Sequence, residues 1–160
     1  MTGPLRKGGM ELRDILLVIH IAAAGTWLGA NIIQAVVPSM ASRQSAEVAA
    51  GWYRVAARLS ARLYMPVAIL ILATGIWMVL DSDVYEFADV FVTIGFAMIL
   101  VGALLGKFVF EPGSNRAAAA VESADQTAIR SASGRIAAFG TLDTLLFLFT
   151  MTAMVLRLGT

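Results

Sequence analysis

The chain has 160 residues and a formal net charge of +1, with 59% hydrophobic and only 14% charged residues. Soluble domains carry about 25% charged residues. This composition, with a mean hydropathy of +0.79, therefore excludes a disordered chain and a nucleic-acid-binding protein, and indicates an integral membrane protein embedded in the lipid bilayer. The absence of cysteine excludes disulfides, iron–sulfur clusters, thiolate zinc sites and cysteine nucleophiles.

Four apolar segments are long enough to cross a bilayer as helices, which takes about 20 residues each. Charged residues or prolines bound every segment, as expected where a helix meets the membrane surface. The first segment exceeds the apolar core of a signal peptide, about 7–15 residues, and we expect it to be retained. We predict an all-α fold in which residues 1–160 form a single membrane domain, a four-transmembrane-helix bundle with spans at 15–37, 63–80, 90–110 and 136–156.

Two further helices are predicted between the spans. Residues 45–62 carry arginine at every fourth position, which makes one face of a helix basic and leaves the other apolar. An alanine-rich helix over residues 116–135 follows a predicted turn at 111–115, where proline and glycine occur together. We predict both as amphipathic helical extensions on the cytoplasmic side. The basic face carries Arg54, Arg58 and Arg62, and the apolar face carries Val48, Trp52, Val55 and Leu59.

The distribution of lysine and arginine predicts the orientation. Eight of the 12 basic residues lie at or beyond the membrane face that holds loops 38–62 and 111–135. Because cytoplasmic loops carry the excess of positive charge, these two loops are expected in the cytoplasm. Both termini and the acidic connection at 81–89 are then outside.

His20, the only histidine in the chain, lies about 9 Å into the first span at 1.5 Å per residue. One interpretation is a bundle histidine that bonds neighbouring groups; the other is a cofactor ligand, because imidazole binds haem iron, copper and zinc. Three methionines are expected at a similar depth, about 8–13 Å from the same face, although methionine also fills gaps in apolar cores. The predicted site for haem b or copper therefore has His20 as the metal ligand, together with Met78, Met98 and Met151.

Asp143 is the one acidic residue within a predicted span, about 10 Å from its cytoplasmic end. Polar groups inside a membrane are costly and therefore mark candidate sites. We predict a structural contact between Asp143 and Lys107 or a hydroxyl group, with Asn31 and Gln34 as alternative partners. A proton relay or a substrate site is the other interpretation. The predicted structural polar residues inside the membrane are Trp27, Asn31, Lys107 and Asp143.

Two pairs of glycines have the small-xxx-small spacing that lets helices approach closely. They are Gly25 with Gly29 and Gly102 with Gly106. They can pack within the bundle, or against a second copy of the chain or a larger membrane complex.

The first span contains the string His20-Ile-Ala-Ala-Ala-Gly-Thr-Trp27-Leu-Gly29. This pattern resembles the CopD-type copper-resistance proteins, the HemJ-type protoporphyrinogen oxidases and a related uncharacterised branch of predicted four-helix membrane proteins. The segments 107–112 and 154–159 are similar to the uncharacterised branch. The resemblance implies a four-helix bundle in the bacterial inner membrane, with His20 at the position of the HemJ-type haem-associated histidine.

Two departures from these families limit what the resemblance implies. The third span begins Val90-Phe-Val-Thr-Ile, without the polar and basic residues of the HemJ-type proteins, and the chain has a single histidine for handling copper. Neither porphyrinogen oxidation nor copper transport is therefore expected.

Three hypotheses about function remain from the sequence. The first is a membrane protein that binds haem or copper through His20, and the second is a non-catalytic accessory or assembly subunit of a larger complex. The third, a carrier that uses Asp143, is the weakest because no inverted repeat is visible. No catalytic residues are predicted, since a lone histidine within lipid does not make a triad.

Overall fold

The computed structural model describes residues 11–159, which form helices and no strand. In chain order the elements are α1 (Leu12–Gln44), α2 (Ala46–Leu59), η1 (Ser60–Tyr64), α3 (Met65–Leu80), α4 (Val90–Leu105), η2 (Gly106–Phe110), α5 (Glu111–Glu122) and α6 (Gln126–Leu156). The segments η1 and η2 are π-helical turns.

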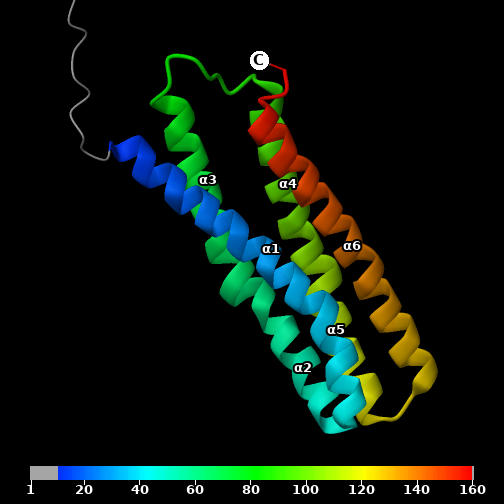
Figure 1. Ribbon diagram of the computed structural model, residues 1–160. Helices are drawn as coiled ribbons and strands as arrows, with labels where there is room; N and C mark the ends of the chain where they lie inside the picture. Colours follow the sequence, from blue (N-terminus) through cyan, green and yellow to red (C-terminus); the bar gives the residue numbers. More distant parts are fainter. Residues whose placement is uncertain (1–10, 160) are drawn as a thin grey trace, which may run out of the picture.

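These elements join into four continuous rods: α1, α2-η1-α3, α4-η2-α5 and α6. Each is long and apolar enough to cross a membrane, consistent with a multi-pass membrane protein. The predicted all-α four-helix bundle is confirmed. Figure 1 shows the rods running lengthwise, with the α1–α2 and α5–α6 turns at one end, the turn end. The α3–α4 loop, residues 81–89, and the C-terminal end of α6 lie at the other, the loop end.

The rods α2-η1-α3 and α4-η2-α5 each contain a proline that does not break the helix. Pro66 and Pro112 lie at the starts of α3 and α5, each directly after a π-helical turn. Proline lacks an N–H, and its ring collides with the carbonyl four residues earlier. Just before each proline, the N–H of Met65 bonds the carbonyl of Ser60 and that of Glu111 bonds the carbonyl of Gly106. These five-residue hydrogen bonds widen the turn, so that the helix continues past the proline.

The predicted turn at 111–115 is consequently wrong, and so is the uninterrupted helix over 116–135. The chain reverses instead at Ser123–Asp125, where Ala124 has a φ of +54°. Asp125 then caps α6, because its carboxylate accepts hydrogen bonds from the N–H groups of Thr127 and Ala128.

The turn end is held together by small side chains. α2 packs closely against α5, and most of the residues that α2 buries are alanines. Val48 and Val55, on the predicted apolar face, are 43% and 49% exposed and lie outside this interface. Alanine and glycine allow two backbones to approach more closely than branched side chains do. The buried residues are Ala49, Ala50, Tyr53, Ala56 and Ala57 of α2, and Gly113, Ser114, Ala117, Ala118 and Ala120 of α5.

The middle of the bundle is built around the Trp27 indole. It stacks on Phe147 with ring centroids 5.7 Å apart and meets Tyr64 edge-on at 5.1 Å. A Cβ at Gly102 would lie 2.6 Å from Cζ2 of Trp27, and one at Gly106 would lie 2.6 Å from Oγ of Ser60. This glycine pair therefore serves packing within the chain.

The other glycine pair is free of such contacts. A Cβ at Gly25 or Gly29 would meet nothing within 4 Å among the residues that the structure describes. The outside of the bundle is otherwise strongly apolar, as expected for a surface that faces lipid.

Candidate ligand-binding site

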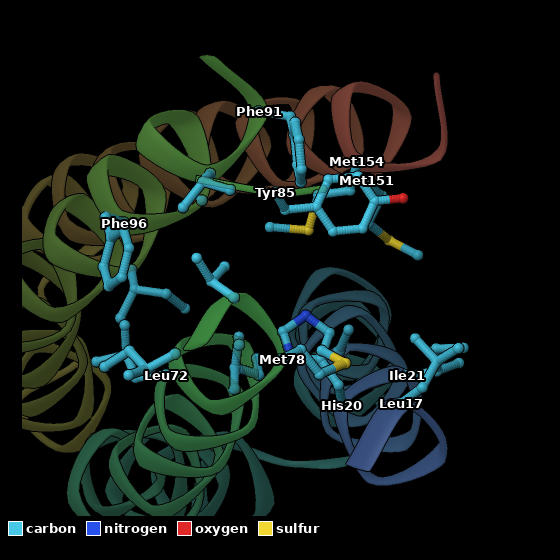
Figure 2. Close-up of a pocket in the computed structure, with 18 of the residues that line it drawn as sticks. Leu17, His20, Ile21, Leu72, Met78, Tyr85, Phe91, Phe96, Met151 and Met154 are labelled. Atoms are coloured by element: carbon cyan, nitrogen blue, oxygen red, sulfur yellow. The ribbon is translucent and has the colours of Figure 1, made fainter. Parts of the chain in front are cut away.

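A cleft opens into the bundle at the loop end, with a volume of about 450 Å³. It lies between two helix pairs, because α1 packs along α3 and α4 along α6, while contacts across the pairs are sparser. Its size falls within the range of about 300–1,000 Å³ that is usual for small-molecule sites. Most of its lining is apolar; the polar or sulfur-containing side chains are Arg13, His20, Met78, Tyr85, Met151, Met154 and Arg157. Figure 2 labels His20, Tyr85 and the three methionines among them.

The imidazole of His20 is oriented by α3. Its Nδ1 lies 2.9 Å from Oγ1 of Thr74, and this hydroxyl donates its proton to the carbonyl of Leu70 at 2.6 Å. Oγ1 must therefore accept a hydrogen bond from Nδ1–H. The carbonyl of Ile71, 3.2 Å from the same Oγ1, is a further acceptor beside the ring. These bonds determine the tautomer, with the proton on Nδ1 and the lone pair on Nε2.

Gly75 allows the ring to lie against α3. A Cβ at this position would be 3.5 Å from Cε1 and 3.9 Å from Nδ1 of His20, so the Cε1–Nδ1 edge faces the helix. Figure 2 shows the ring projecting into the cleft. Within residues 11–159, no hydrogen bond is formed to Nε2. The result is an imidazole with its basic nitrogen available, held as metal-ligating histidines are held by a second partner.

The structure brings two of the three predicted methionines to this cleft. Met78 of α3 and Met151 of α6 line it, together with Met154. Met98 does not: it is 5% exposed and packs in the core cluster that contains Trp27. The depth of a residue along its helix predicts its level in the membrane. The direction of its side chain decides whether it enters the cleft or, as with Met98, the core. Met154, which the sequence reasoning missed, was signalled by its three-residue spacing from Met151 on one helix face.

Two arginines line the cleft beside Tyr85. The guanidinium carbons of Arg13 and Arg157 lie 5.8 and 5.4 Å from the ring centroid of Tyr85, which the α3–α4 loop supplies. Arginine stacks on aromatic rings and binds the oxygens of carboxylate or phosphate groups in pairs. An apolar interior, one imidazole and two arginines together suit a largely apolar molecule that carries anionic groups at one edge.

The part of the chain that the structure describes contains no group of three or more His, Cys, Asp or Glu side chains arranged to hold a metal ion. A metal in this cleft would therefore have a single imidazole, with thioether sulfurs as the other protein donors nearby.

Asp143 belongs to a separate polar network in the middle of the bundle. It is 2% exposed, and its Oδ2 accepts hydrogen bonds from Trp27 Nε1 at 3.3 Å and Asn31 Nδ2 at 2.8 Å. The network continues because the Tyr64 hydroxyl donates to Oδ1 of Asn31 at 2.8 Å and accepts from Gln34 at 3.0 Å. It joins α1, η1 and α6 and does not line the cleft.

The predicted contact between Asp143 and Lys107 is wrong, and the alternative partner Asn31 is confirmed. Lys107 pairs instead with Glu111, one turn along its own rod, with 3.1 Å between Nζ and Oε2. Both are accessible at the bundle surface, where lysine can keep its charged end in the polar region. Asn31 is the direct partner, and Gln34 is connected through Tyr64.

Comparisons with models of protein families, with curated proteins and with solved structures find no match to this chain. We therefore infer the function from the geometry of the cleft.

Proposed function

We propose that this protein is a small integral membrane protein that binds haem b in the loop-end cleft, with His20 as the residue that would hold the haem iron. The observation that carries the proposal is the hydrogen bond from Nδ1 of His20 to Thr74, which leaves the lone pair of Nε2 for a metal. A histidine that served only packing would have no need of an exposed basic nitrogen in an open apolar cleft.

The cleft suits haem in three respects. Its volume lies within the range usual for small-molecule sites, and its apolar lining suits a hydrophobic macrocycle. Arg13 and Arg157 line the cleft and are of a chemical type that binds carboxylates such as the propionates, and Met78, Met151 and Met154 would offer thioethers as further donors to the iron. When bound, haem would supply one-electron chemistry, and the protein's part would be to bind, orient and shield it.

Copper is the second candidate, favoured by the same methionines. Imidazole and thioether are suitable ligands for Cu(I), but a single ion would leave most of the 450 Å³ cleft unfilled. Haem accounts for more of the site. The remaining alternative is a non-catalytic accessory subunit, in which the open Gly25–Gly29 face packs against a second copy or a larger complex.

The resemblance to the CopD-type and HemJ-type proteins supports a location in the bacterial inner membrane. The excess of arginine at the turn end supports an orientation with that end in the cytoplasm and the cleft facing outside.

An absorption spectrum and a metal analysis of the detergent-purified protein, before and after dithionite, test the proposal. The full chain, as isolated or after incubation with haemin, is expected to show a Soret band whose position changes on reduction. The band should be lost in His20→Ala and retained in Met98→Leu, a matched change outside the cleft. Stoichiometric copper without a Soret band would replace haem by copper. A helical protein that takes up neither would overturn both and leave the accessory subunit.

A further inference from the structure

A second, chemically different hollow lies between α2 and α5, beside the π-helical turns. Its volume is about 460 Å³, similar to that of the loop-end cleft. Alanines of the two helices alternate with charged side chains around it. The groove is lined by Arg54, Ala57, Arg58, Ala61 and Arg62 on one side, and by Glu111, Asn115, Ala118, Ala119 and Glu122 on the other.

Pairing within the chain leaves this groove positively charged. Arg54 forms an ion pair with Glu122, and Glu111 forms one with Lys107, so both carboxylates of the groove are neutralised. Arg58 and Arg62 form no ion pair with any residue between 11 and 159. They are four residues apart on one helical face, so two guanidinium groups point to the same side.

The groove also offers a neutral donor. Asn115 lines it from α5, and a side-chain amide supplies two N–H groups. Two guanidinium groups on one wall and an amide on the other form a donor set for an anion with several oxygens. Arginine binds phosphate oxygens in pairs, which a point charge cannot do.

The position of the groove along the bundle indicates where such a phosphate comes from. Arg62 directly precedes the apolar segment 63–80, and Glu111 directly follows the apolar segment 90–110. The groove is therefore at the depth where the hydrocarbon region ends and the headgroups begin. In the neighbouring turns, Met65 and Phe108 are 49% and 68% exposed, so apolar surface for acyl chains lies at the adjacent level.

We propose that the groove between α2 and α5 binds the phosphate of an anionic phospholipid, with Arg58, Arg62 and Asn115 as its ligands. The inference does not depend on the loop-end cleft or on haem.

Native mass spectrometry of the full chain in detergent, titrated with phosphatidylglycerol or phosphatidylcholine, tests this site. The expected result is preferential binding of phosphatidylglycerol, with an affinity about tenfold lower in the double variant Arg58→Gln/Arg62→Gln. Arg43→Gln/Arg130→Gln is the matched control, because it removes the same charge from exposed positions outside the groove. Binding in the control should equal that of the unaltered chain.

Equal losses in the two double variants would overturn the proposal, since general electrostatic attraction would then explain the preference. It would also be overturned if glycerol 3-phosphate competed as strongly as the lipid, because the ligand would then be a free phosphate compound. If the arginine variant lost helicity, Asn115→Ala tests the same groove and should weaken phosphatidylglycerol binding about threefold.

Discussion

The two ends of the bundle differ in the size of the side chains at their helix contacts. At the turn end, alanine, glycine and serine predominate between α2 and α5, and the two helices are in close contact beneath a groove lined by charged side chains. At the loop end, larger side chains such as Leu72, Phe96 and Met154 border the space between the helix pairs, which remains open. Small residues allow two backbones to meet, whereas large residues that pack mainly within their own pair leave a cleft. The closed end thus holds the four rods together while the open end can receive a ligand.

Enlarging a side chain at the closed end is expected to break this arrangement most severely. Ala117 is 0% exposed and packs with Tyr53, so Ala117→Leu has no space and should lower the free energy of unfolding by about 3 kcal/mol. Denaturation followed by circular dichroism in detergent measures the change. Ala119→Leu, at an exposed position two residues along α5, is the control and should have an effect below about 0.5 kcal/mol. Equal effects would contradict the importance of close packing here.

The polar network between the two ends is expected to matter next. Asp143→Leu would leave the N–H of the buried Trp27 without its acceptor and would remove one of the two acceptors of the Asn31 amide, and it should cost about 2 kcal/mol in the same measurement. Asp143→Asn keeps one carbonyl oxygen and the same shape, so a loss below about 1 kcal/mol is expected. A carrier function for Asp143 would instead require that Asp143→Asn abolish transport while the fold stays intact.

At the open end, a substitution of Thr74, which orients His20, tests ligand binding. Thr74→Val removes the acceptor for Nδ1 of His20 without changing the size of the side chain. Haem affinity should fall about tenfold, because second partners of metal-ligating histidines typically contribute about 10–100-fold. A haemin titration followed at the Soret band measures it. Thr152→Val, at an exposed hydroxyl on α6 that bonds only the Leu148 carbonyl, should leave the affinity unchanged.

The smallest effect on stability is expected where the cleft itself is filled. Ala24 lines the cleft, so Ala24→Leu places a larger side chain in open space and should change the free energy of unfolding by less than about 1 kcal/mol. The same substitution should reduce haem uptake by occupying the site. A destabilisation as large as that of Ala117→Leu would show that the two ends do not differ in packing.

Parts of the candidate site could be predicted from the sequence and parts could not. The single histidine within an apolar span was visible at once, because a polar group there is rare and costly. Thr74, which determines the tautomer, lies 54 residues away in the chain and gave no signal. Asp143 and Asn31 are also far apart in the chain, by 112 residues. The sequence therefore favoured Lys107, a residue of opposite charge, as the partner of Asp143.

The sequence by itself determined the four membrane helices, because the cost of burying charge and unpaired backbone groups in lipid acts locally along each segment. It also determined the polar residues that had to find partners inside the bundle. Only the tertiary structure decided that π-helical turns precede Pro66 and Pro112. It also decided that α2 buries its alanines and exposes Val48 and Val55, and that Met154 rather than Met98 lines the cleft with His20. These outcomes depend on how closely two helices approach and on how each is rotated about its axis. Packing between distant segments sets both quantities, and local hydropathy does not encode them.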